Sequence, residues 1–209
     1  MYIPKQFREE RPEVLRAFIA RHPLGALVAL TADGLTANHL PMIWHEREGT
    51  AGVLHGHLAR ANPLWKTLAP EAPVLVIFGG ANRYISPSWY PAKQEHGKVV
   101  PTWNYSVVHA HGTIRFNENP DHSLRHLGEL TDHQEASRSE PWRVSDAPAE
   151  YIEPMVKRVI ALEIAVTRLI GKFKASQHRH ESERTAVAAA LISEGLSSAD
   201  LDEVVRAPT

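Results

Sequence analysis

A chain of 209 residues, 43% of them hydrophobic, is long enough to bury a full core. It contains no cysteine, which excludes disulfide bonds and thiolate metal sites, and its net charge of −1 predicts no general attraction to nucleic acid. The N-terminal segment lacks the apolar stretch of a signal peptide, and no apolar run approaches the roughly 20 residues of a membrane span. We therefore expect a cytoplasmic protein without a membrane segment.

The first part of the chain predicts a helix, a β-hairpin, two further strands and a short helix. Pro12 opens an amphipathic segment, and proline is common at the first position of a helix. Asp33 and Gly34 separate two β-type runs, which is a hairpin signal, while Asn62 followed by Pro63 is typical of a helix start. The expected elements are a helix over 12–22, strands over 26–30, 35–44 and 51–57, a helix over 64–68 and a strand over 74–78.

The segment 84–105, called the aromatic loop below, holds five of the fifteen aromatic residues and three prolines in twenty-two positions. Proline fixes φ and removes a backbone donor, so a long regular element is not expected here. The aromatic rings need partners for their faces and their polar tips. Two interpretations remain open: a rigid binding surface, or a loop that packs its own aromatic side chains over the core.

The second part of the chain predicts two more strands among helices. Asn119 and Pro120 mark a helix start, and the leucines that follow recur at helical spacing. The expected elements are a strand over 102–116, a helix from 119 that includes Leu124, Leu127 and Leu130, a helix over 148–156, a strand over 158–170, and helices over 183–193 and 198–206. Six strands with helices between them favour a mainly β, α+β fold: an antiparallel barrel with peripheral helices.

Two His-x-His pairs lie in strand-like runs, His55 with His57 and His109 with His111. Side chains two residues apart on a strand share one face of a sheet, which is a geometry that can bind metal. Because no third ligand is fixed by spacing, we expect no bound metal. The simpler interpretation is that these histidines bond backbone groups or stack on the sheet.

The segment 54–63 combines features of an anion site. A strand ends there, backbone amides follow over 58–61, Arg60 supplies a guanidinium, and a helix begins at Asn62. Free amides at a helix start and an arginine can bind a phosphate together. The alternative is an ordinary helix cap with a solvated arginine, and the local sequence does not decide between the two.

Motifs of several common enzyme classes are absent. The chain has no helical His-Glu-x-x-His, no Gly-x-Gly-x-x-Gly, no phosphate-binding loop and no Gly-x-Ser-x-Gly. Hydrolases, kinases and nicotinamide-dependent dehydrogenases therefore lack their usual signatures here, and whether the chain is an enzyme stays open.

Several motifs in chain order resemble one family. They are MYIPKQF (1–7), ANHLP (37–41), GHLARANP (56–63), YISPSWYP (84–91), VPTWNY (100–105), PW (141–142) and GKFKASQHR (171–179). This pattern resembles the PaiB-like FMN-binding negative transcriptional regulators. The resemblance implies an antiparallel split β-barrel, a homodimer with FMN at the subunit interface, a barrel domain over 1–180 and a C-terminal helical appendage over 181–209.

The resemblance also implies roles for individual residues. Residues implied to hold the flavin ring edge and ribityl phosphate are His57, Leu58, Ala59, Arg60 and Asn62, and those implied to face the isoalloxazine are Asn38 and His39. Residues implied to come from the partner subunit are Trp103, Asn104, Lys174, Ser176 and Gln177. In this context Trp89 and Tyr90 become structural anchors of the aromatic loop. One departure from the family pattern is His178, where Asn is usual.

The resemblance implies a flavin-binding protein with a regulatory or flavin-dependent redox role, acting on a small-molecule substrate in the second case. One alternative is a DNA-binding repressor, which the net acidic C-terminal helices disfavour. Another is a haem-binding split barrel, with an axial ligand among His39, His55, His57 and His109.

Overall fold

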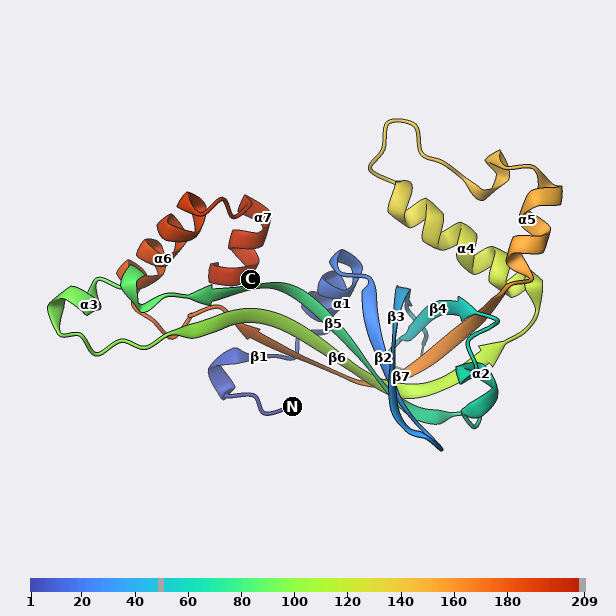
Figure 1. Ribbon diagram of the computed structural model, residues 1–209, viewed down its shortest axis with the longest axis horizontal. Coiled ribbons are helices and arrows are strands. Elements are labelled where there is room, and N and C mark those ends of the chain that lie inside the picture. The colour runs from blue at the N-terminus through green and yellow to red at the C-terminus, as the bar shows by residue number, and fades with distance from the viewer. Residues whose placement is uncertain (49–50, 207–209) are drawn as a thin grey trace. The chain divides into compact units, whose positions relative to one another are not determined.

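The computed structural model describes residues 1–48 and 51–206, which fold into two compact units (Figure 1). We call residues 19–77 and 110–169 the barrel unit. Residues 1–18, 78–109 and 170–206 are called the terminal unit, because they include both ends of the described chain. Strands β5 (Ala72–Ile85), β6 (Thr102–Asn117) and β7 (Val159–Lys174) contribute to both units.

Six strands pair in a closed circuit. The short strands are β2 (Leu24–Thr31), β3 (Gly34–His45) and β4 (Val53–Ala59), and the pairing order is β7-β4-β3-β2-β5-β6 with β6 returning to β7. Residues of the barrel unit form antiparallel ladders between β2 and β3, β2 and β5, β3 and β4, and β4 and β7. The predicted antiparallel barrel with peripheral helices is confirmed.

Alternation of side chains explains the barrel. On β4, Leu54 and Leu58 are buried, whereas His55 and His57 point to the opposite face and are half-buried. The β2–β3 hairpin turns at Gly34, whose φ of 109° suits glycine, and it pairs Leu30 with Leu35. The hairpin and the shared face of His55 and His57 were both predicted correctly.

Three helices belong to the barrel unit: α2 (Leu64–Thr67), α4 (Pro120–Glu135) and α5 (Ala149–Val156), with a 3₁₀ turn over Val144–Asp146. Helix α4 begins as predicted, since the Asn119 side chain accepts the N–H of Asp121 at 2.9 Å. The face of α4 that packs toward β4 carries Ser123, His126 and Leu130. Of the leucines in the predicted pattern, Leu130 is buried and Leu124 is exposed.

The terminal unit has its own core. Its elements are β1 (Arg8–Glu9), most of α1 (Pro12–Arg21), α3 (Ala92–Glu95), α6 (Glu181–Ser193), α7 (Ser198–Leu201), 3₁₀ turns over Lys5–Phe7 and Pro87–Trp89, and a π-helical turn over Asp202–Arg206. The buried core residues are Ile85, Tyr90, Val187, Leu191, Leu201, Val204 and Val205. Helices α6 and α7 therefore pack on the start of the aromatic loop.

The aromatic loop packs some of its aromatic side chains on the core and exposes others. Tyr90 is buried, with the Arg179 guanidinium 4.9 Å from the centre of its ring, and Trp89 packs against the same core. Trp103 is half exposed and meets Tyr84 edge to face, with ring centres 6.3 Å apart. The loop holds only a 3₁₀ turn and one short helix before β6, in agreement with its proline content.

Two further expectations concern the ends of the fold. The predicted appendage over 181–209 starts where α6 starts, but residues 207–209 lie outside the described part, and the separate status of this appendage stays a prediction. Among the described residues, no helix combines the length and apolar character needed to cross a membrane.

Candidate functional site

The predicted site residues fall into two sets, one in each unit. Those in the barrel unit are Asn38, His39, His57, Leu58, Ala59, Arg60 and Asn62. Those in the terminal unit are Trp103, Asn104, Lys174, Ser176 and Gln177.

The barrel set contains a linked pair of amides. Asn62, in the turn after β4, donates from Nδ2 to Oδ1 of Asn38 on β3 at 2.7 Å. The Oδ1 atom of Asn62 accepts the N–H of Leu64 at 3.0 Å and so caps α2. His39 is exposed on β3, whereas Leu58 is buried in the barrel. The structure thus brings Asn38 and Asn62 together and directs Leu58 into the core.

Arg60 lies at the end of β4 with its guanidinium at the protein surface. Its Nε donates to the carbonyl of Lys157 at 2.8 Å, and its Nη1 lies 3.3 Å from Oε2 of Glu118. The guanidinium also lies 5.6 Å from the centre of the Trp65 ring. Because Glu118 is largely exposed, this ion pair is worth little and can yield to a stronger anion.

Part of the predicted amide cradle is occupied by backbone bonds. The N–H of Arg60 donates to the carbonyl of Arg158 at 2.7 Å, and the N–H of Asn62 donates to the carbonyl of Ala59 at 2.8 Å. Helix α2 has only four residues, so it offers no sustained helix dipole. What remains for binding an anion is the Arg60 guanidinium.

An open cavity of about 570 Å³ lies beside Arg60 in the barrel unit. Trp65 and Glu118, both in contact with Arg60, line it together with Arg115 and Phe116. Arg115 pairs with Glu71, another residue of the lining. The cavity therefore offers aromatic surface and cationic groups in one place, and its volume falls in the range of small-molecule pockets.

In the terminal unit, three of the predicted residues are occupied by internal bonds. Asn104 is fully buried, and its Nδ2 donates to Oγ of Ser176 at 2.9 Å and to the carbonyl of Val204 at 3.0 Å. Gln177 donates from Nε2 to the carbonyls of Gln6 and Phe173 and accepts the N–H of Ala175. These contacts give Asn104, Ser176 and Gln177 a structural role.

Trp103 and Lys174 are the members of this set with exposed groups. Lys174 donates to the hydroxyl of Thr102 and to the carbonyl of Trp103, and burial lowers the pKa of its ammonium. His178, the departure from the family pattern, packs edge to face on Phe7 with ring centres 5.4 Å apart. Burial and the neighbouring Arg179 lower the pKa of His178.

The outward histidines of β4 lie in a larger polar cluster beneath α4. Nδ1 of His57 lies 3.1 Å from Nε2 of His126, so one of these rings donates to the other. The rings of His45 and His55 lie 4.2 Å apart. Burial lowers the pKa of His55 and of His57, and burial together with His57 lowers the pKa of His126 to about 3. The imidazoles of His55, His57 and His126 are therefore neutral at neutral pH.

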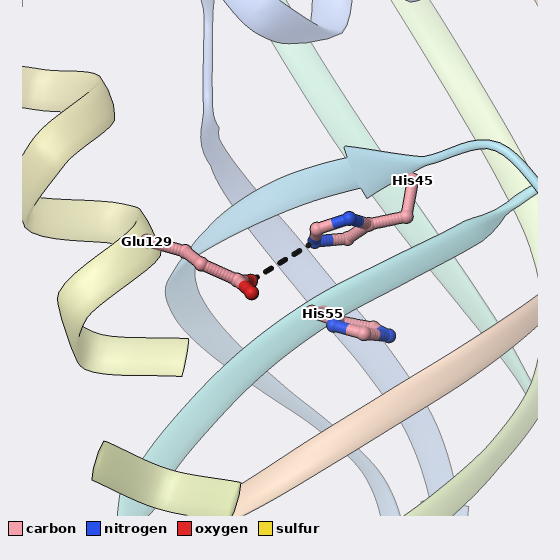
Figure 2. A group of neighbouring side chains, drawn as sticks. All are labelled: His45, His55 and Glu129. Carbon is pink, nitrogen blue, oxygen red and sulfur yellow. Dashed lines mark ion pairs between the residues drawn. The ribbon is translucent and has the colours of Figure 1, made fainter. Parts of the chain in front are cut away.

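Figure 2 shows Glu129 of α4 reaching toward this cluster, with Oε2 3.5 Å from Nε2 of His45. His45, His126 and Glu129 were not predicted as members of a site, because they join His55 and His57 only in the folded barrel unit. The spacing of His126 and Glu129, one helical turn apart, is the signal that could have placed both on one face.

The haem alternative depends on a ring nitrogen, because iron binds histidine through a lone pair in the plane of the imidazole. Nδ1 of His57 is engaged with Nε2 of His126, whereas Nε2 of His55 has no hydrogen-bond partner among the described residues. The haem alternative therefore stays a prediction.

Comparisons with known proteins agree with this architecture. A family model described as "Putative FMN-binding domain" matches residues 1–168. An uncharacterized protein of Emericella nidulans is 33% identical, with 90% of this chain and 88% of that protein covered. The Protease synthase and sporulation protein PAI 2 of Bacillus subtilis is 31% identical, with 88% of this chain and 85% of that protein covered.

Among solved structures, the FAD and haem binding protein from Mycobacterium smegmatis is similar in fold, with a TM-score of 0.57. The similarity covers 80% of this chain and 73% of that chain at 17% identity, so it is evidence of a shared fold only. The chain belongs to the "Putative FMN-binding domain" family, the PaiB-like family that its motifs resemble, and it has the split-barrel fold.

Proposed function

We propose that the barrel unit binds FMN and that Arg60 holds the phosphate. The observation that carries the proposal is Arg60, whose side chain is 36% exposed beside an open cavity in a member of an FMN-binding family. A phosphate would replace Glu118 as the partner of Arg60, since a dianion binds a guanidinium more strongly than an exposed carboxylate does.

The residues around Arg60 fit a flavin. Trp65 and Phe116 give the cavity an aromatic lining, which suits a planar ring system. The Asn38 and Asn62 amides, bonded to each other, can offer a donor and an acceptor to polar ring edges. When bound, a flavin supplies one-electron and hydride chemistry. The chain's own contribution is to hold, orient and shield it.

The phosphate assignment predicts a difference between two flavins. Arg60→Ala should weaken FMN binding by about 1.5–3 kcal/mol and leave riboflavin almost unchanged, because riboflavin lacks the phosphate. Fluorescence titration of the purified protein with FMN, FAD and riboflavin measures this. Titration with FAD tests whether the site prefers FMN to FAD, since the flavin phosphate of FAD carries a bulky AMP group.

Two further variants sharpen the test. Glu118→Gln removes the competing carboxylate, so it should strengthen FMN binding and leave riboflavin unaffected. Arg125→Ala on α4, an exposed arginine, is the matched control and should change neither affinity. Equal losses for FMN and riboflavin in Arg60→Ala would remove Arg60 from the phosphate site.

The proposal includes a homodimer. Three leucines of the β2–β3 hairpin, Leu24, Leu30 and Leu35, are 60%, 67% and 79% exposed, which is unusual for apolar side chains gathered on one hairpin. A second copy of the chain would cover them. The hairpin is our candidate for part of the subunit interface.

A regulatory role is also part of the proposal, and the PAI 2 relative of Bacillus subtilis motivates it. We propose that regulation acts through binding of the flavin or of a partner, and not through a helix that recognises DNA. The apolar residues of α6 and α7 pack in the core of the terminal unit. The first turns of these helices carry the acidic residues Glu181, Glu183 and Asp200, which would repel DNA phosphates. A gel-shift assay with random DNA at low salt should show no retention.

A further inference from the structure

The cluster beneath α4 contains three side chains from three elements. His45 lies at the end of β3, His55 lies on β4, and Glu129 lies on α4 (Figure 2). Their ligand atoms all lie within 4.8 Å of one another. The β3–β4 register places Ile43 opposite His55, so His45, two residues further along β3, points to the same outer face.

Each of these two imidazoles has a buried nitrogen without a hydrogen bond. Nε2 of His45 and Nε2 of His55 are both buried, and neither has a hydrogen-bond partner among the described residues. The Glu129 carboxylate at 3.5 Å is too far from His45 Nε2 for a good hydrogen bond. Two buried nitrogens without a hydrogen bond, one near Glu129 and one near Glu163, favour a ligand, because leaving such atoms unpaired is costly.

The distance between the ligand atoms suits a shared metal ion better than a hydrogen bond. Two ligands that bind one ion tetrahedrally at about 2.1 Å lie about 3.4 Å apart. The His45–Glu129 separation of 3.5 Å matches this value, and the 4.8 Å limit on the other pairs is closed by small side-chain rotations. An ion bound there would satisfy both orphaned nitrogens at once.

The surroundings can orient these ligands. Glu163 on β7 pairs with His55 in the register, and its Oε2 lies 3.6 Å from Nε2 of His55. Arg47 holds both oxygens of Glu163, at 2.8 and 2.7 Å. Glu163 is therefore held beside the Nε2 edge of His55, where it restricts rotation of the ring. The exposed flank of Glu129 leaves room for water as a fourth ligand.

We propose that His45, His55 and Glu129 form a binding site for a divalent transition-metal ion, with Zn²⁺ as the best match to two imidazoles and one carboxylate. The ion joins α4 to β3 and β4. The site uses none of the residues assigned to the flavin, so its test is independent of flavin binding.

The test uses the full-length, untagged protein after treatment with a chelator. Calorimetric titration with ZnCl₂ should show one ion per chain, and Zn²⁺ should raise the midpoint of thermal unfolding. Glu129→Gln and His55→Gln should each weaken Zn²⁺ at least about tenfold, a loss seen even when an outer partner of a ligand is removed. Both should also abolish the thermal shift.

The controls are exposed side chains of the same helix. Asp132→Asn matches Glu129→Gln and His133→Gln matches His55→Gln, and both controls should bind Zn²⁺ as the wild type does. Because the Glu129 side chain is 42% exposed, its variant should fold even if the histidine variant does not. Unchanged affinity in Glu129→Gln, or an equal loss in Asp132→Asn, would overturn the proposal.

Discussion

Trp103 and Asn104 are neighbours in the sequence but differ in solvent exposure. The family resemblance implies that both contact the cofactor. On β6 they point to opposite faces, so Trp103 is 53% exposed while Asn104 is fully buried and bonded to Ser176 and Val204. Asn104 thereby joins the last turn of the described chain to β6 within the terminal unit.

This contrast predicts different effects on stability. Asn104→Ala should lower the free energy of unfolding by about 2–3 kcal/mol, because it leaves a buried hydroxyl and a carbonyl without donors. Trp103→Ala should cost at most about 1 kcal/mol, as an exposed side chain loses little. Urea denaturation of both variants measures the difference. Similar losses would show that Asn104 is not the structural link described here.

Features of single residues could be predicted from the sequence where they depend on near neighbours in the chain, and not where they depend on distant ones. The shared face of His55 and His57 needs only strand periodicity, and the cap at Asn119 needs only its neighbours, so both were predictable. The partners of these histidines were not, because Glu129 and His126 arrive from a helix more than sixty residues away along the chain. Burial of Asn104 likewise depends on residues near the C-terminus.

At the scale of elements, β1 is a strand of two residues whose main feature is Glu9. The Glu9 carboxylate accepts the N–H groups of Glu10 and Arg11 just before α1 begins, and it also accepts two bonds from the Arg11 guanidinium. Hydrogen bonds from Arg11 hold the pKa of Glu9 below its usual value of 4.5. Glu9 thus fixes the two residues that lead from β1 into α1.

A lowered carboxyl pKa predicts the direction of a pH effect. The stabilisation from Glu9 is present above the unfolded pKa near 4.5, and it is lost as the pH falls through the folded pKa below that value. Glu9→Gln should cost about 1 kcal/mol at pH 7, a modest value because Arg11 is half exposed, and should flatten stability below pH 4.5. Thermal unfolding from pH 7 to 3 measures this, with the exposed Glu10→Gln as the control that should keep the wild-type profile.

The elements themselves were largely predictable, and their lengths were not. The hairpin and the helices carry local signals in glycine, proline and asparagine. Strand β5 runs to Ile85 instead of the expected 78, because backbone pairing continues through Gly79, Gly80 and the polar residues that follow. Strand β1 has two residues, too few to show an alternation of apolar and polar side chains.

At the scale of the whole molecule, the exposed hairpin leucines predict the oligomeric state. The chain should be a dimer, and Leu35→Lys should shift it toward monomer, because burying an unpaired charge in an apolar contact is costly. Sedimentation equilibrium measures the association constant. Leu124→Lys on α4, also an exposed leucine, is the control and should remain dimeric. A dimer that survives Leu35→Lys would exclude the hairpin from the interface.

The order in which the two units are completed has a consequence for synthesis. The barrel unit is complete at residue 169, whereas the terminal unit needs both its first 18 residues and Val204 and Val205 for its core. A ribosome releases Ile85 and Tyr90 long before it releases their partners on α6 and α7. Apolar surface left uncovered in this way promotes aggregation. The nascent chain therefore carries the unfinished terminal unit until Val204 and Val205 emerge and cover this apolar surface.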